Sequence, residues 1–257
     1  MPIPLPAKPA NGATINTGHA MASGLVRCIL YNEGSGSPVE LVGTASGTLA
    51  GSASWATDTN LGGTCLDTSV TTGDGVNWAA NGLSYGNADC SVFIAGRIPT
   101  IAARQHVAAE AAGGTTDGWF CGLGDSGQMQ FVLADVVALD SGAGALTVGD
   151  IYTIGYAFDR GVGVLFHGKN QTADTTITDS VANASAPTAS ANPSATSNRR
   201  SFASAWDDRL AFIYIWNRAL VAADFVSLHL DPYQFISTGG RSDRRVRSRG
   251  WCVRRPV

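Results

Sequence analysis

The stretch that decides the fold is "DRLAFIYIWNRALVAADFVSLHLDPY", residues 208–233. Its first part is a dense apolar run that ends in aromatic residues, a pattern that predicts a buried strand. After Asn217 the pattern changes to the mixed apolar spacing of a short helix over about residues 222–230. Pro232 ends that helix, because proline cannot continue one. The stretch therefore predicts one core strand followed directly by one helix.

Most of the remaining sequence is typical of short strands joined by tight turns. Glycine is abundant, with 31 residues, and only 14% of the chain is charged. Residues 99–114 allow either a helix or a strand edge with a loop, and the polar stretch 171–201 predicts a long surface loop with at most a frayed edge strand. Strand-like runs bounded by Gly, Asp or Asn occur at 25–34, 90–98, 118–123, 128–139, 151–159 and 162–168. Their spacing predicts an all-β chain with two antiparallel sheets packed face to face.

Charge and proline divide the chain into three parts. Residues 1–17 carry four prolines, which predict an extended N-terminal arm. Residues 18–238 form the predicted domain. Residues 239–257 form a C-terminal tail with seven arginines and one acid, whereas residues 1–240 hold 10 basic and 19 acidic residues. The sequence thus predicts an acidic body with a basic tail.

The cysteines and the apolar runs indicate the kind of cellular compartment in which the chain is made. No run approaches the roughly 18 apolar residues of a membrane span, and the N-terminus lacks the basic start and apolar stretch of a signal peptide. The five cysteines include no Cys-x-x-Cys pair. Cys28, Cys90 and Cys121 lie inside apolar runs and are expected to be small core residues. A reducing site of synthesis fits this pattern.

Three stretches match catalytic motifs, but their context argues against each. "GLGDSG", residues 122–127, satisfies a dinucleotide fingerprint, yet a strand-like run follows where the phosphate-binding helix should begin. The same stretch resembles a serine-protease nucleophile segment, but no matching base segment surrounds His19 or His106. "GLSYG", residues 82–86, should join a strand to a helix and instead precedes a strand. No catalytic residue is expected, and 122–127 predicts a hairpin turn.

No metal site is expected either. The four histidines, at positions 19, 106, 167 and 229, have no partner at metal-ligand spacing. Asp74, Asn77 and Asp89 lie near turns and leave calcium as a weak alternative. Asx residues at turns more often bond their own backbone, so the structural interpretation is favoured.

The opening stretch resembles the end of laminin-G-like, or concanavalin A-like, jelly-roll domains. The resemblance rests on Trp216-Asn217-Arg218-Ala219-Leu220 and the helix after it, on "GLVRCILYNEGSG" at 24–36, and on three middle strands, "CSVFIAGRI", "IYTIGYAFD" and "GVLFHGK". It covers about residues 20–236 and implies a jelly-roll sandwich whose helix caps one open end with Leu220, Phe225 and Leu228. The family commonly begins that helix with Ser-x-x-Glu, where this chain has Val221 and Asp224, so about 1 kcal/mol of capping is missing.

This fold carries hydrolases and glycan-binding modules, so function depends on the site. Jelly-roll hydrolases place two carboxylates on one strand as Glu-x-Asp-x-x-Glu or a near variant. Glutamates occur only at 33, 40 and 110, so hydrolase activity is disfavoured. A lectin-like module would use exposed aromatic side chains, with Trp78, Tyr85 and Trp119 as candidates. The alternative for each is a plug at the end of the core.

The resemblance also extends to proteins encoded by tailed phages. It implies a non-enzymatic virion component, such as a capsid decoration or a head or tail fibre protein, with host-surface glycan binding as the alternative. The tail is expected to dock on a major capsid or tail protein, or on another copy of the chain, and nucleic acid is the less favoured partner. Its candidate binding residues are Arg241, Arg244, Arg245, Arg247, Arg249, Trp251, Arg254 and Arg255.

Overall fold

The structure is a computed structural model of the 257-residue chain. It describes residues 4–43, 46–68, 75–78, 89–98, 105–111, 118–124, 128–133, 137–140, 146–159, 163–170, 176–182, 200–202, 206 and 208–237.

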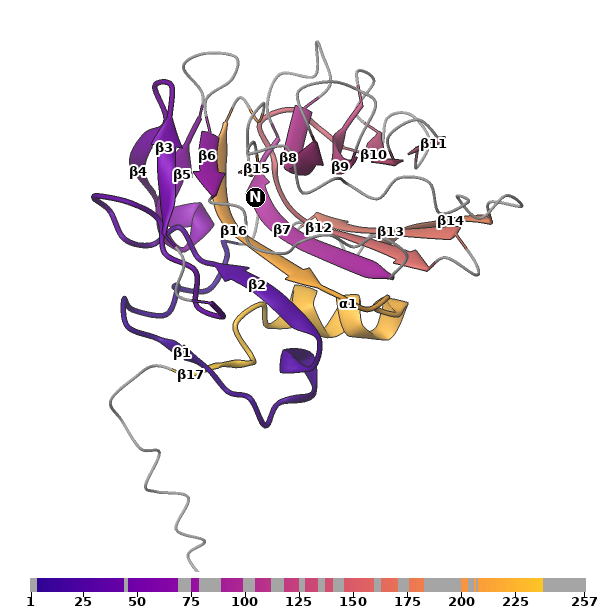
Figure 1. Ribbon diagram of the computed structural model, residues 1–257, viewed down its shortest axis with the longest axis horizontal. Helices are drawn as coiled ribbons and strands as arrows, with labels where there is room; N and C mark the ends of the chain where they lie inside the picture. The colour runs from indigo at the N-terminus through magenta and orange to yellow at the C-terminus, as the bar shows by residue number, and fades with distance from the viewer. Residues whose placement is uncertain are drawn as a thin grey trace, which may run out of the picture.

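Among the described residues, two large antiparallel sheets pack face to face, as the sequence predicts, and a third sheet consists of β1 (Thr14–Ile15) and β17 (Ile236–Ser237) alone (Figure 1). The larger sheet has the order β14 (Thr176–Ala182), β13 (Gly163–Asn170), β12 (Ile151–Asp159), β7 (Cys90–Arg97), β16 (Arg209–Trp216), β5 (Gly63–Asp67) and β4 (Ser54–Asp58), and β2 (Leu25–Ile29) also pairs with β16. The smaller sheet has the order β11 (Val137–Asp140), β10 (Met129–Leu133), β9 (Gly118–Leu123), β8 (Gln105–Ala111), β15 (Arg200–Phe202), β6 (Gly75–Trp78) and β3 (Gly47–Ala50). Residues 99–114 therefore contain a strand, and 171–201 contains β14 and the start of β15.

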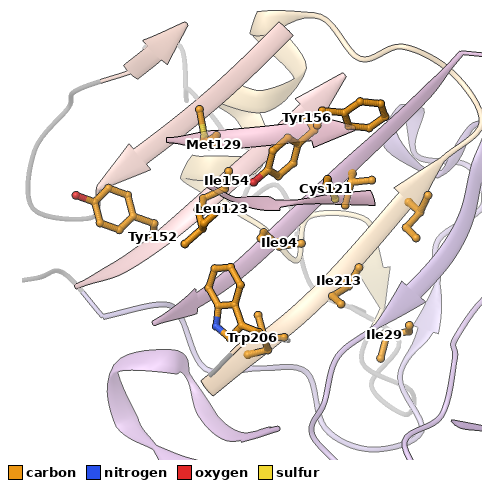
Figure 2. Close-up of a cluster of buried hydrophobic side chains, with 14 of the residues drawn as sticks. Ile29, Ile94, Cys121, Leu123, Met129, Tyr152, Ile154, Tyr156, Trp206 and Ile213 are labelled. Carbon is orange, nitrogen blue, oxygen red and sulfur yellow. The ribbon is translucent and has the colours of Figure 1, made fainter. Parts of the chain in front are cut away.

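The main core lies between the two sheets. Alternate residues of β7, β12 and β16 face inward, among them Ile94, Ile154 and Ile213, and meet Cys121 and Leu123 from β9 (Figure 2). The Tyr156 hydroxyl donates a 2.6 Å hydrogen bond to the Gly122 carbonyl, which ties β12 to β9 across the core. As predicted, Cys28, Cys90 and Cys121 are buried and not disulfide-bonded.

A second core covers the outer face of the larger sheet. The intervening residues of β7 and β16, including Phe93 and Phe212, face away from the sandwich and pack with Phe225 and Leu228 of α1 (Ala222–Leu230). A Cβ added at Gly155 on β12 would lie 2.4 Å from Phe225 Cδ1, so the helix rests directly on the sheet. Figure 1 shows α1 on the side opposite β8–β11. The jelly-roll resemblance predicts that the helix caps an open end of the sandwich, and this prediction is wrong. The helix covers the outer face of the larger sheet, because the outward-facing residues of β7 and β16 are as apolar as the inward-facing ones.

The helix begins as the sequence predicts, without a side-chain cap. Val221 is its N-cap residue and has no side-chain acceptor, while Asp224 Oδ2 accepts from the Val221 N–H at 3.2 Å. Only the second half of a capping box is therefore present. Ser91 of β7 secures the preceding turn, since its Oγ donates to the Arg218 carbonyl and accepts from the Leu220 N–H, both at 2.8 Å.

The two ends of the described chain meet. β1 (Thr14–Ile15) pairs with β17 (Ile236–Ser237), and the Asn16 N–H donates to the Phe235 carbonyl at 2.9 Å. Residues 4–15, called the strap below, also pack on the body. Leu5 is buried, and its N–H donates to the Asn60 carbonyl next to η2 (Thr59–Leu61) at 2.9 Å. The segment predicted to be a separate arm is therefore part of the domain from residue 4 onward.

Candidate binding groove

An open groove of about 500 Å³ lies beside the strap. One wall is formed by residues 10–14, and the other by residues 32–33 and 39–41. Asn11 and Thr14 are exposed along the first wall. It is called the strap groove here, and polar residues line both of its walls.

The first wall is held in place by hydrogen bonds that follow from its sequence. Pro4, Pro6 and Pro9 keep the strap extended, and the Asn32 side-chain amide donates to the Pro9 carbonyl at 2.7 Å. The chain then turns sharply, with the Ala13 N–H bonded to the Ala10 carbonyl at 3.1 Å and with Gly12 at a φ of 84°. A left-handed φ of this kind favours glycine. The turn leads directly into β1.

The second wall is a tight connection after β2. The Leu41 N–H donates to the Cys28 carbonyl at 2.8 Å, and an isolated bridge pairs Ile29 with Glu40. Glu33 Oε1 accepts from the Val39 N–H at 2.8 Å and thereby closes the loop between them. Both glutamates of this connection therefore lie at the groove.

Two glutamates, Glu33 and Glu40, line the groove, and each is held by other groups of the protein. Glu40 forms a buried ion pair with Arg27, and their side chains are 0% and 5% exposed. Burial raises the pKa of Glu40, and the charge of Arg27 opposes that rise. Glu33 Oε2 and Glu40 Oε1 are buried and accept no hydrogen bond from the described part of the chain. Because both oxygens are covered by the protein, the lining that a ligand can reach is formed by exposed residues such as Asn11, Thr14 and Val39.

A second cluster of charged side chains contains Asp58, Asp208, Arg97 and Arg209, which pair with one another. Asp58 contacts Arg97 Nη2 at 2.6 Å and Arg209 Nη1 at 3.3 Å, and it caps η2 through the Asn60 N–H at 3.0 Å. Burial opposes ionisation of Asp58, but these donors hold its pKa below the usual value. Burial raises the pKa of neighbouring Asp208 to about 6. Because its cations and carboxylates pair with one another, this cluster stabilises the fold and offers little to a ligand.

The aromatic candidates for glycan stacking are not assembled into a site. Trp78 is only 2% exposed and lies in the main core, so this prediction is wrong. The reason is Gly47, its partner on β3: a side chain there would lie 3.0 Å from the indole, and glycine leaves room for the ring between the sheets. Trp119 pairs with Leu133 through its backbone, and its side chain is outside the described part of the structure, as is Tyr85. The eight candidate residues of the tail also lie outside the described residues.

The remaining motif predictions concern turns and metals. Gly122 and Gly124 belong to the β9–β10 hairpin, where the Gly124 N–H donates to the Gln128 carbonyl at 2.9 Å, so the predicted hairpin is confirmed. Residues 82–86 and Asp74 lie outside the described residues.

The other two candidate calcium ligands lie on different elements: Asn77 is exposed on β6, and Asp89 precedes β7. Among the described residues, no three His, Cys, Asp or Glu side chains are grouped closely enough to hold a metal ion. In the same part of the chain, no helix is both long and apolar enough to cross a membrane.

The sequence did not predict the groove. Its one signal is the placement of glutamate, since two of the three glutamates of the chain fall in the segment 33–40. That scarcity argued against a hydrolase motif, but it could not indicate that a strap distant from Glu40 would form the facing wall.

No protein-family model matches the chain, and neither does any curated protein. Solved structures share its fold. The binding domain of Paraclostridial Mosquitocidal Protein 1 matches with a TM-score of 0.54 and 10% identity over 82% of this chain and 53% of that one. The botulinum neurotoxin serotype D ligand-binding domain in complex with N-acetylneuraminic acid matches with a TM-score of 0.54 and 10% identity over 82% of this chain and 52% of that one. The Trypanosoma rangeli sialidase in complex with sialic acid matches with a TM-score of 0.53 and 11% identity over 83% of this chain and 34% of that one.

These likenesses show the fold, a lectin-like β-sandwich. This chain spans about half the length of the toxin binding domains and about a third of the sialidase. The ligands in those structures belong to those proteins.

Proposed function

We propose that the chain is a non-enzymatic, lectin-like module that binds carbohydrate in the strap groove. The observation that carries this proposal is the open groove itself, which exposed Asn11 and Thr14 line on one wall and exposed Val39 lines on the other. The side-chain amide of Asn11 and the hydroxyl of Thr14 can bond sugar hydroxyls at the rim.

The fold supports this proposal without fixing the ligand. The toxin binding domains use a similar sandwich as part of larger proteins, and one of them is in complex with a sialic acid. None of the residues that line the strap groove is cationic, so nothing in its walls pairs with the carboxylate of an acidic sugar. We therefore expect a neutral or amino-bearing glycan.

The way in which Glu40 is held supports the non-enzymatic part of the proposal. A glycosidase needs a carboxylic acid that reaches the glycosidic oxygen and a second carboxylate beside it. The Glu40 side chain is fully covered and paired with Arg27, and Glu33 Oε1 is committed to the Val39 N–H. Neither group is free to donate a proton to a substrate, so the groove is suited to binding.

A glycan array tests the proposal with two matched variants of the strap. Ala10 is exposed and lines the groove, and Ala7 is exposed on the same strap outside it. Ala10→Trp fills the groove and should abolish retention, whereas Ala7→Trp should retain the wild-type glycan profile. Equal retention by both variants, or no retention of any neutral or amino-bearing glycan by folded protein lacking residues 239–257, would refute the proposal. A bound glycan released as a shortened product would refute the non-enzymatic part.

The second candidate is a virion-associated structural role, as the resemblance to phage-encoded proteins implies. The pairing of β1 with β17 supports it, because the arginine-rich extension then departs from one fixed place on the domain. Co-sedimentation with purified phage particles tests it. Binding by the full chain and not by residues 1–238 is expected, and failure of both would contradict it.

A further inference from the structure

The lining of the strap groove that a ligand can reach is largely aliphatic. Ala10 is exposed on the first wall, and on the second wall Val39 is 38% exposed and Leu41 is half-buried. Among the described residues, no aromatic side chain lines the groove. A ligand made only of hydroxyl groups would leave these aliphatic side chains in poor contact, so the groove favours a ligand that carries a small apolar group.

Asn32 supplies an oriented hydrogen-bond acceptor in the same groove. Its Nδ2 donates to the Pro9 carbonyl at 2.7 Å. A carbonyl oxygen can only accept, so this bond fixes which end of the Asn32 amide faces the strap. The Oδ1 atom accepts no hydrogen bond within the described part of the chain and is not enclosed by it. Because Asn32 lines the groove, Oδ1 is a neutral acceptor for one donor group of a ligand.

The charged groups at the groove are already held by the protein. Glu33 accepts from the Val39 N–H, and the Glu40 side chain is covered and paired with Arg27. A charged ligand group therefore meets no oppositely charged side chain prepared for it, and it would give up water to enter a largely aliphatic groove. The groove thus suits a donor group that is neutral.

We propose that the strap groove recognises the acetamido group of an N-acetylated amino sugar, with the N–H donated to Asn32 Oδ1 and the methyl group placed against Val39 and Leu41. This inference rests on the proposed carbohydrate function and names the class of sugar. An acetamido group joins a neutral N–H donor and a methyl in one small planar unit. Its oxygen is an acceptor for the side-chain amide of Asn11, which is exposed on the facing wall.

The experiment is an NMR titration of the full chain with methyl glycosides of N-acetylglucosamine, N-acetylgalactosamine, glucose, galactose and glucosamine. At least one N-acetylated sugar should bind about tenfold more tightly than its parent hexose, and glucosamine should bind more weakly than N-acetylglucosamine. A buried methyl accounts for about fourfold of this preference, and a hydrogen bond to the acetamido oxygen accounts for a further severalfold. Saturation transferred from the protein to the ligand should be strongest at the acetyl methyl.

Two analogues of the preferred sugar separate the two contacts without changing the protein. The N-formyl analogue lacks only the methyl and should bind about fourfold more weakly. The 2-O-acetyl analogue keeps the methyl and the carbonyl but replaces the N–H with oxygen. It should bind about tenfold more weakly, because Asn32 Oδ1 then loses its donor.

A matched pair of variants tests the apolar contact from the side of the protein. Val39→Thr keeps the shape of the side chain but replaces a methyl with a hydroxyl, so the preference for the N-acetylated sugar should fall by about fourfold. Val42→Thr is the control, because Val42 is 40% exposed in the same connection and does not line the groove. It should leave the preference unchanged.

Three outcomes would overturn this inference alone: the N-acetylated sugars bind no more tightly than the parent hexoses, the 2-O-acetyl analogue binds as tightly as the N-acetyl sugar, or Val39→Thr and Val42→Thr have equal effects. In each case, sugar binding that Ala10→Trp abolishes would leave the proposed function standing. If the folded chain binds none of these sugars, both proposals fail.

Discussion

Among single residues, Lys8 is placed most unusually. Lys8 belongs to the strap, and its buried amino group donates to the Tyr31 carbonyl at 3.1 Å and to the Thr64 carbonyl. Burial lowers the pKa of Lys8 from 10.5 to about 7, although the nearby carboxylates of Glu33 and Asp58 oppose this shift. The charged form is therefore tolerated in the folded state only at a cost in stability.

This pKa predicts how stability depends on pH. Between about pH 7 and 10.5 the unfolded chain keeps the proton on Lys8 and the folded chain releases it, so the unfolded state binds more protons. The free energy of unfolding should then rise with pH across this window, by at most about 1.4 kcal/mol per pH unit. Urea denaturation at pH 7 and pH 9 should show this rise in the wild type and a smaller rise in Lys8→Met. An equal rise in both would contradict the assignment to Lys8.

At the level of elements, packing rather than capping holds helix α1 in place. Phe225 and Leu228 are fully buried against the larger sheet, and Ser91 fixes the turn that leads into the helix. Val221, in contrast, is 60% exposed and offers no acceptor at the N-cap position. The helix therefore forms despite a poor start, as tertiary packing usually outweighs local propensity.

The missing cap predicts a stabilising substitution. The Asp224 N–H already donates to the Val221 carbonyl at 3.0 Å. Val221→Ser would add a side-chain acceptor at the same place and complete the capping box, so the free energy of unfolding should rise by up to about 1 kcal/mol. Val226→Ser changes the same residue types at a helix position that is 44% exposed and needs no cap, and it should change stability by less than about 0.5 kcal/mol. Chemical denaturation compares the two. A Val221→Ser protein no more stable than Val226→Ser would show that another group satisfies the helix start.

For the whole molecule, the strap joins parts of the chain that are far apart in sequence. It bonds to η2 through Leu5, to Gly62 after η2 through Lys8, to Asn32 through Pro9, and to β17 through β1. It also builds one wall of the groove. Stability of the N-terminal segment and integrity of the candidate site are therefore coupled.

The coupling predicts that a strap residue matters to global stability. Leu5→Ala removes a side chain that is 7% exposed and should lower the free energy of unfolding by about 2 kcal/mol. Leu230→Ala is the matched control, because Leu230 is 72% exposed and its truncation should cost less than about 0.5 kcal/mol. If Leu5→Ala is no more destabilising than Leu230→Ala, the strap is not part of the cooperative fold.

Local patterns in the sequence were sufficient to predict several core strands, the β9–β10 turn and helix α1. The run from Asp208 to Tyr233 predicted β16 and α1, and the apolar segments predicted β7, β9 and β12, because periodicity and turn residues act locally. It also predicted the buried cysteines and the incomplete cap at Val221.

Only the tertiary structure decided which face each element covers and which side chains meet. The sequence could not show that Gly47 makes room for Trp78, or that Gly155 lets Phe225 rest on the outer face of the sheet. The groove depends on the same kind of information, since residues 10–14 and Glu40 meet only when β1 pairs with β17 and the strap is tied down at Gly62. Contacts between segments far apart in sequence depend on chain closure and packing, and local patterns do not encode them.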